Sequence, residues 1–330
     1  LFIFLFSCGL SNGQLPFESD SMFNSIRVEL SVDGIKKRAL FDNGAEISVI
    51  FLKEKNDLNK YDVERKSFII DSKGNKNPAY LLKKVKIEID QLNIQEKQQV
   101  LAFIGVPKIL ADLNVSFILG NNFINKFDWK IDFTQRNILL VVDFDRLEID
   151  SFINLKLLQG NRSGNFVKVS SNQSVDTFKI DFGNSTTLMT SNTKLFNAPQ
   201  FVKISKNESV NGFSVDTLLM HVENNLIFSD NLCVIDLPSF VQSESYSSLI
   251  GLDFFIPFGQ IYLVNSEELL LLPKLNEHQY TYKQEVTFNN KVVSRIEPYT
   301  TLRSIDISTD EPIEIKLPPT KYKSNGGRCD

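Results

Sequence analysis

An internal duplication constrains the fold of this chain more than any other feature of its sequence. Residues 40–50 run from an apolar stretch into Asp42, then a glycine, and out through a second apolar stretch; residues 179–189 repeat this order around Asp181. The two aspartates lie 139 positions apart (181 minus 42). The pairs that share this spacing are Asn43 with Phe182, Gly44 with Gly183, Ala45 with Asn184, and Ser48 with Thr187. One Asp-x-Gly turn is common in loops, but a second copy in the same context disfavours an ordinary surface turn.

A second pair of matching blocks follows in the same order. Residues 119–127 align with residues 250–258 at an offset of 131 (250 minus 119), and the alignment continues without a gap to residues 138–140 of the first half. Two blocks repeated in order indicate that the chain is built from two similar halves.

The residues around the first aspartate favour strands. Hydrophobic residues alternate with polar ones over residues 26–32, Asp33-Gly34 is a favoured two-residue hairpin turn, and residues 35–42 return toward Asp42. Such a hairpin would hold Asp42 at the end of a paired, rigid strand.

The 330 residues suffice for two domains, and the glycine- and polar-rich stretch at 160–164 is typical of a loop. We therefore place the boundary between the halves in the region that leads to this loop, residues 143–164. The sequence predicts a signal remnant and linker over residues 1–25, lobes over 26–150 and 151–273, and C-terminal strands with a disordered tail over 274–330.

The repeated blocks resemble the motifs of retropepsin-like and pepsin-like aspartic proteases, in which Asp-Thr/Ser-Gly follows two apolar residues and an apolar-apolar-Gly motif comes later. Residues 40–45 with 118–120, and 179–183 with 249–251, carry the resemblance. It implies an all-β, two-lobed, pepsin-like architecture built from two retropepsin-like halves of closed-barrel type, with few short helices.

The resemblance also implies an aspartic-type endopeptidase, in which a water molecule activated between Asp42 and Asp181 attacks the peptide bond. In such a site two carboxylates about 3 Å apart cannot both ionise, so one retains its proton. The supporting residues of the two loops would be Asn43, Gly44, Ala45, Ser48, Phe182, Gly183 and Thr187. A hairpin around residues 71–80, with Asp71, Gly74 and Tyr80 as candidates, would form the flap over the substrate. We expect a monomer acting on a peptide or protein, without a metal or other cofactor.

Two positions depart from the family pattern. Asn43 and Phe182 occupy the places where the family has Thr or Ser, whose hydroxyl bonds to the opposite loop. Asn43 can still form such a bond, whereas the Phe182 side chain cannot. A catalytically degenerate protein that binds peptides without cleaving them therefore remains the alternative.

Other functions fit less well. The net charge of −4 and the absence of a Lys/Arg run disfavour nucleic-acid binding. The two histidines, His221 and His278, are far apart and lack metal-ligand spacing, which disfavours a zinc peptidase. Asp181-Phe182-Gly183 matches a kinase signature, but no Gly-x-Gly-x-x-Gly or His-Arg-Asp accompanies it.

The first residues indicate export. Residues 1–9 form an apolar run that is too short to span a bilayer and is typical of the end of a secretory signal. Residues 5–8 also resemble a bacterial lipobox, in which Cys8 is lipidated; a plain cleaved signal is the other possibility. The protein would then be secreted or anchored to the cell envelope, and would contact a membrane only through this lipid. Cys233 lies in an apolar strand-like run, and pairing with Cys329 is conceivable in an oxidising compartment.

Overall fold

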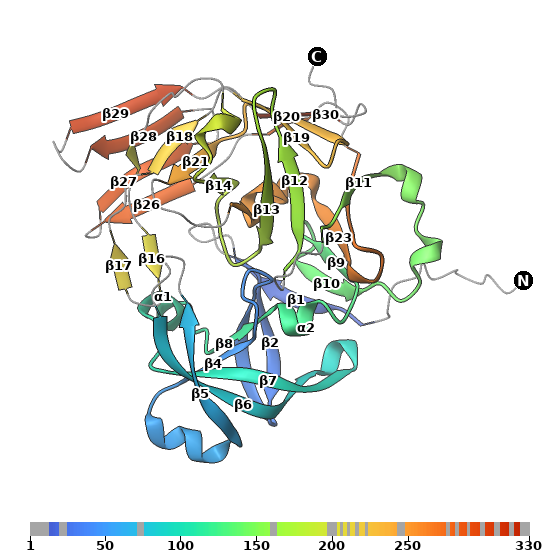
Figure 1. Cartoon of the computed structure of the whole chain (residues 1–330), viewed down its shortest axis with the longest axis vertical. Helices are drawn as coiled ribbons and strands as arrows, with labels where there is room; N and C mark the ends of the chain where they lie inside the picture. Colours follow the sequence, from blue (N-terminus) through green and yellow to red (C-terminus); the bar gives the residue numbers. More distant parts are fainter. Residues whose placement is uncertain are drawn as a thin grey trace, which may run out of the picture.

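The chain is mostly β, with few and short helices, in a computed structural model. Figure 1 shows two lobes, one built from the blue to green first half and the other from the green to orange second half. The model describes residues 13–19, 25–70, 76–158, 164–196, 203–204, 207–209, 212–214, 218–221, 224–242, 248–274, 278–280, 284–288, 291–297, 301–306, 311–316 and 320–323.

The first lobe contains ten strands and four short helical segments. The strands are β1 (Leu15–Glu18), β2 (Arg27–Val32), β3 (Ile35–Phe41), β4 (Val49–Leu52), β5 (Val63–Ile70), β6 (Lys76–Ile89), β7 (Ile94–Ile104), β8 (Phe117–Leu119), β9 (Trp129–Asp132) and β10 (Asn137–Leu140). The helical segments are η1 (Lys55–Lys60), η2 (Asp90–Leu92), α1 (Lys108–Asp112) and α2 (Asn121–Ile124).

Six of these strands close into a barrel. They neighbour one another in the order β2-β3-β8-β4-β7-β6, and β6 pairs back with β2. The β2–β3 hairpin has the predicted turn, with Asp33 and Gly34 both at positive φ (47° and 77°), as a two-residue turn of this kind requires. Alternate residues of β2 are buried, which explains the period of two in the sequence.

The second lobe repeats the central part of this topology. β13 pairs in parallel with β22, β14 in parallel with β21, and β14 antiparallel with β22. The corresponding first-lobe pairs are β3 with β8, β4 with β7, and β4 with β8, in the same orientations. The duplication read from the sequence is therefore a duplication of strand pairing, although this lobe forms a half-barrel and the first a closed barrel.

The remaining strands and helical segments continue along the chain. The strands are β11 (Phe152–Lys156), β12 (Phe166–Ser170), β13 (Val175–Asp181), β14 (Leu188–Thr190), β15 (Lys203–Ile204), β16 (Asn207–Ser209), β17 (Gly212–Ser214), β18 (Leu218–His221), β19 (Asn225–Phe228), β20 (Leu232–Ile235), β21 (Ser239–Gln242), β22 (Leu249–Gly251), β23 (Gln260–Val264), β24 (Leu269–Pro273), β25 (His278–Tyr280), β26 (Gln284–Phe288), β27 (Lys291–Glu297), β28 (Thr301–Asp306), β29 (Glu311–Lys316) and β30 (Thr320–Lys323). The helical segments are η3 (Phe144–Arg146), η4 (Ile149–Ser151), η5 (Thr193–Leu195), η6 (Leu252–Phe254), η7 (Ile256–Phe258) and η8 (Asn265–Glu267).

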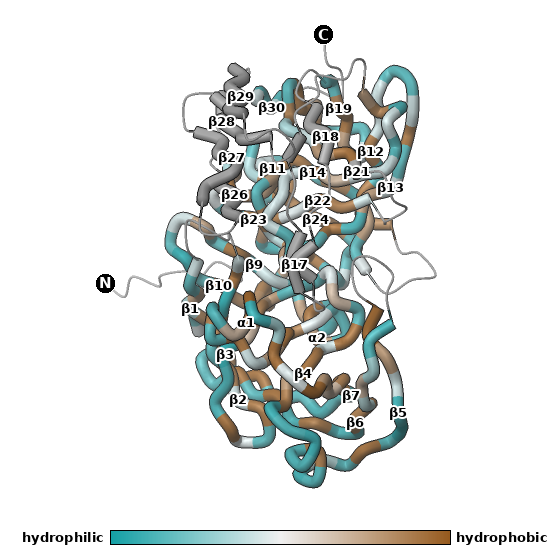
Figure 2. The backbone as a smooth tube through the Cα atoms, turned by 90° about the vertical axis from the view of Figure 1, so that its left-hand side faces the viewer, coloured by the Kyte–Doolittle hydropathy of each residue, from teal (hydrophilic) through white to brown (hydrophobic). Residues whose placement is uncertain are grey.

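A sheet made by both halves joins the lobes. Its order is β11-β24-β23-β9-β10-β1, so that β9 of the first half lies against β23 of the second. A continuous apolar core includes residues of both halves, among them Trp129 and Leu263, which are opposite each other in this sheet. In Figure 2 the hydrophobic residues alternate with hydrophilic ones along the strands, as expected for strands with one buried face.

Two segments differ from their predicted roles. The predicted signal remnant and linker over residues 1–25 includes Leu15–Glu18, which is instead a strand because Leu15 and Phe17 are buried on one face. The predicted disordered tail at the end of residues 274–330 includes Thr320–Lys323, which instead forms β30, between β20 and β25, with its alternate residues buried.

The strands predicted over residues 274–330 include β26 and β27, which form a hairpin and extend into a four-stranded antiparallel sheet with β28 and β29. Cys233 is buried in β20 and is disulfide-bonded. The proposed partner Cys329 and the lipidation candidate Cys8 lie outside the described residues. Within the described part of the chain, no helix is long and apolar enough to cross a membrane.

Candidate active site

Asp42 and Asp181 end equivalent strands and are held by equivalent backbone bonds. Asp42 Oδ1 accepts the N–H of Gly44 at 2.8 Å, and Asp181 Oδ1 accepts the N–H of Gly183 at 3.0 Å. Each aspartate carbonyl also accepts the N–H three residues later, at 3.3 Å in the first loop and 3.2 Å in the second. Both carboxyl groups are therefore oriented by equivalent tight turns.

The two loops meet where the lobes join, and the glycines allow them to approach. A Cβ atom added at Gly44 would overlap the Asp181 carboxyl, and one added at Gly183 would overlap the Asp42 carboxyl. Figure 1 shows the loop after β13 extending down to the loop after β3. Each glycine thus makes room for the carboxyl group of the opposite lobe, which gives the site an approximate twofold symmetry.

The two carboxyls lie within hydrogen-bonding range of each other and are half-buried. Burial raises the pKa of Asp42 above its ordinary value; the backbone N–H groups of Gly44 and Ala45, the hydrogen bond with Asp181 and the charge of Lys179 oppose this rise. Burial and the negative charge of Asp42 raise the pKa of Asp181 to about 8. The pair therefore retains a shared proton well above the pH at which an isolated carboxyl ionises.

Asn43 makes the bond between the loops that the sequence predicted it could make. Its Oδ1 accepts the backbone N–H of Phe182 at 2.9 Å, and its side chain is fully buried. The Asn43 Nδ2 has no hydrogen-bond partner among the described residues. This buried amide therefore ties the first loop to the second through one of its two ends.

The Phe182 ring takes part in the contact between the lobes through packing. It stacks on Phe41 of the first lobe with ring centroids 6.4 Å apart. It also contacts Phe255 of the second lobe in an edge-to-face arrangement, with ring centroids 5.5 Å apart. Phe41 in turn packs on Trp129 at 5.4 Å. Aromatic contacts thus connect Trp129 and Phe41 of the first lobe with Phe182 and Phe255 of the second.

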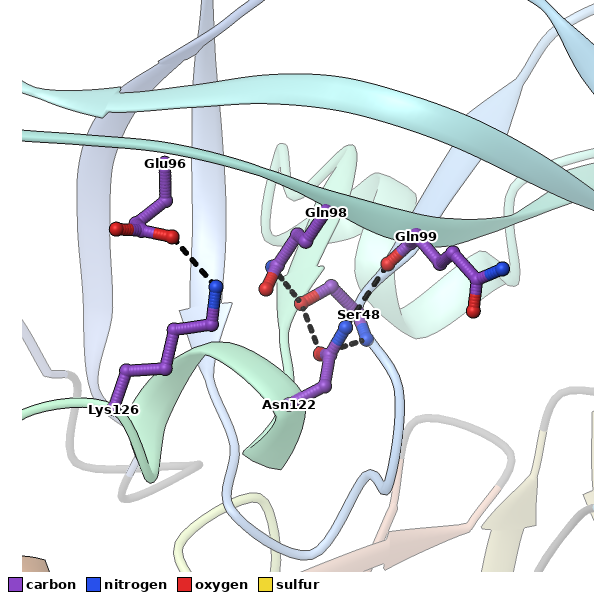
Figure 3. Close-up of polar contacts among 6 residues, drawn as sticks. All are labelled: Ser48, Glu96, Gln98, Gln99, Asn122 and Lys126. Atoms are coloured by element: carbon purple, nitrogen blue, oxygen red, sulfur yellow. Dashed lines mark hydrogen bonds and ion pairs between the residues drawn. The ribbon is translucent and has the colours of Figure 1, made fainter.

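Ser48 fixes the end of the first loop. Its Oγ accepts the backbone N–H of Gly120 at 3.0 Å and donates to Asn122 Oδ1 at 2.9 Å. Figure 3 shows Asn122 and Gln98 converging on Ser48, and Asn122 continuing to the backbone carbonyl of Gln99. This network joins the loop to β7 and α2.

Each aspartate loop also packs closely against the glycine of the second repeated block in its own half, Gly120 in the first and Gly251 in the second. A Cβ atom at Gly120 would lie 2.7 Å from Ser48 N, and one at Gly251 would overlap the Thr186 carbonyl. Thr187, the counterpart of Ser48, is buried and donates its hydroxyl to the Pro238 carbonyl. The two repeated sequence blocks are therefore in direct contact within each lobe.

The predicted flap corresponds to the hairpin of β5 and β6, which pair from Val63 with Leu82 to Ile70 with Lys76. Tyr80 lies in β6 and packs partly buried against the core. Asp71 and Gly74 lie outside the described residues.

Lys179 is the site residue that the sequence reading missed. Its ammonium donates to the Gly44 carbonyl of the first lobe at 2.6 Å. The charge of Lys179 therefore lies close enough to both carboxyls to lower their pKa values. The spacing of 139 aligns it with Leu40, a buried apolar residue, and this mismatch was the available signal. A lysine in a strand is ordinarily taken for a solvent-facing residue.

No family model matches this chain, and a search of curated proteins finds no relative. Among the described residues, no group of three or more His, Cys, Asp or Glu side chains is arranged to hold a metal ion.

Proposed function

We propose that this protein is an aspartic-type endopeptidase that hydrolyses peptide bonds with water. The observation that carries the proposal is the Asp42–Asp181 pair: two hydrogen-bonded carboxyls from two lobes, packed reciprocally on glycines, with pKa values raised by burial. Such a pair supplies a base and an acid from one shared proton.

In the proposed reaction, the ionised carboxylate takes a proton from a water molecule whose oxygen attacks the peptide carbonyl carbon. The protonated carboxyl donates its proton to the carbonyl oxygen, so the tetrahedral product is neutral. The carboxylate that gave up its proton then accepts a hydroxyl proton from the intermediate, while the carboxyl that took the proton from water donates it to the leaving nitrogen, and the C–N bond breaks. Because the two carboxyls titrate as a pair, neither aspartate is assigned a fixed role.

The departures at Asn43 and Phe182 are consistent with a working pair, since the Asn43 hydrogen bond and the Phe182 ring contacts hold the two loops together. The unpartnered Asn43 Nδ2 favours the second candidate, a protein that binds peptides without cleaving them, because a less well satisfied loop positions the carboxyls less firmly.

We also propose that the protein acts as a monomer on peptides or unfolded proteins outside the cytoplasm. Export, whether by a cleaved signal or through lipidation of Cys8, rests on residues 1–9, which lie outside the described residues.

The test is proteolysis of an unfolded protein from pH 3 to pH 9 by wild type, Asp42→Asn and Asp181→Asn, with products identified by mass. Asp230→Asn is the matched control, because Asp230 is exposed and paired with Lys168. We expect cleavage by the wild type and the control, and its loss in both site variants. Folded wild type without activity at any pH would refute the endopeptidase and leave the peptide-binding protein.

A further inference from the structure

Lys179 occupies an unusual position for a lysine. It lies in β13, where its backbone is paired on both sides, with Phe166 of β12 and with Leu249 of β22. Its side chain is only partly exposed and passes over the backbone of Gly164, where an added Cβ atom would lie 2.9 Å from Lys179 Cε. The alkyl chain therefore lies alongside Gly164, and the ammonium at its end reaches the other lobe.

The ammonium ends on the first aspartate loop, where it donates to the Gly44 carbonyl at 2.6 Å. Gly44 is the residue that packs against the Asp181 carboxyl. Lys179 thus crosses from the second lobe to the first, and Asn43 binds from the first lobe to the second. These two side chains make reciprocal polar ties between the loops.

The other aspartate and Lys179 are among the largest charged influences on the two carboxyls, and the charge of Lys179 lowers the pKa of both and so opposes the effect of burial. In the described part of the chain, the neighbouring loops and strands also contain the acidic residues Glu46, which is exposed, Asp176, which accepts the Ser248 hydroxyl, and the buried Asp253.

We propose that Lys179 is a positioning residue that sets the pH window of the aspartate pair and makes the second polar tie between the loops. This inference rests on the proposed function for its kinetic consequence. Its electrostatic consequence holds independently of catalysis. A positive charge beside a carboxyl pair favours ionisation, so removing it should move both titration steps of the pair to higher pH.

Three substitutions separate the charge from the hydrogen bond. Lys179→Arg keeps the charge, Lys179→Gln keeps a donor without the charge, and Lys179→Met removes both. Lys168→Met is the control for loss of a lysine, because Lys168 lies on the adjacent β12 and pairs with the exposed Asp230.

The first readout is the pH dependence of proteolysis. We expect both limbs of the profile to move upward by about one pH unit in Lys179→Gln and Lys179→Met, since a neighbouring charge shifts carboxyls by about 1–3 units. Lys179→Arg and Lys168→Met should retain the wild-type profile. A Lys179→Gln profile that matches the wild type would overturn the inference.

The second readout is urea unfolding between pH 4 and pH 9, which needs no activity. Because the folded state binds the shared proton more tightly than the unfolded state, stability falls as pH rises until the pair has ionised. In Lys179→Gln and Lys179→Met this fall should extend to a pH about one unit higher than in the wild type. An inactive wild type with this displacement would refute only the endopeptidase, whereas unchanged unfolding curves would refute the role of Lys179.

Discussion

The two aspartate loops have equivalent backbone hydrogen bonds but different side chains between the aspartate and the glycine. The Asp-to-Gly hydrogen bond, the turn behind it and the contact with the later glycine recur in both halves. The residue after the aspartate is a hydrogen-bonding Asn43 in one loop and an aromatic Phe182 in the other. The backbone and the glycines therefore define where the carboxyls lie, while the ties between the lobes can be made by different chemistry.

The approach to each aspartate shows the same contrast. Leu40 is buried in an apolar cluster of the first lobe, whereas the equivalent Lys179 extends to the Gly44 carbonyl. The hydrogen bond made by a side chain of the first half comes from Asn43 in the loop itself. The one made by a side chain of the second half comes from Lys179 in the strand that leads to the loop. A duplicated fold can therefore preserve a shared site while its two halves diverge around it.

Removing the Phe182 ring should have the largest effect. Phe182→Ala should reduce the free energy of unfolding by roughly 3–5 kcal/mol, the usual cost of deleting a buried aromatic ring. Phe178→Ala is the matched control, because Phe178 is equally buried but precedes the loop. Urea unfolding should show similar losses for both, and only Phe182→Ala should lower the proteolytic rate per folded molecule. Equal rates in the two variants would show that the aromatic contact does not position the pair.

Substitutions that fill the space between the two loops should have the second-largest effect. Gly44→Ala and Gly183→Ala should each lower kcat by roughly 100-fold, because the added methyl displaces the opposite carboxyl and such misplacements of about 1 Å have this cost. Gly34→Asn is the control: this hairpin glycine has open space around it and a positive φ that Asn tolerates. A fully active Gly44→Ala variant would contradict the close approach of the loops.

The Asn43 tie should have a smaller effect. Asn43→Ala leaves the buried Phe182 N–H without an acceptor and should cost roughly 1–3 kcal/mol of stability. Asn43→Thr supplies a hydroxyl oxygen and should recover part of this loss. Thermal or urea unfolding of the three proteins measures the difference, and an Asn43→Ala variant as stable as the wild type would show that this bond contributes little.

The smallest expected effect is the change of the free energy of unfolding with pH, which tests whether the two carboxyls share a proton. Burial raises the carboxyl pKa values, so stability from this source is complete below the unfolded value near 3.8 and is lost as pH rises toward about 8. The slope should be at most about 1.4 kcal/mol per pH unit for one proton. Asp181→Asn should flatten the curve in this range, while an equally steep curve would assign the slope to other groups.

Much of the fold follows from the sequence because duplication is visible as two constant spacings. These spacings identified the paired strands, both aspartates and the later glycines. Residues 15–18 and 320–323 escaped prediction because each strand is only four residues long and pairs with a strand far away in the sequence, β1 with β10 and β30 with β20. Pairing between residues so far apart leaves little local pattern in a short segment.

The site was predictable where a residue type is required by the chemistry and missed where position alone gives it a role. The repeated turn, with an aspartate and a glycine in each copy, predicted the residues that the structure brings together. The mismatch between Lys179 and Leu40 in the repeat was the one signal for this lysine, but neither its bond to the Gly44 carbonyl nor the packing of the Phe182 ring on Phe41 could be predicted from the sequence. Both roles depend on the approach of the opposite lobe.

The most direct test of the central claim, that Asp42 and Asp181 form one titrating pair, is the titration of their carboxyl carbons by NMR in wild type and Asp42→Asn. We expect the wild type to ionise in two separate steps, the later near pH 8, and Asp181 to ionise at distinctly lower pH once the charge of Asp42 is removed. If both carboxyls titrate independently near 3.8, or if Asp181 titrates identically in the two proteins, the two aspartates do not share a proton.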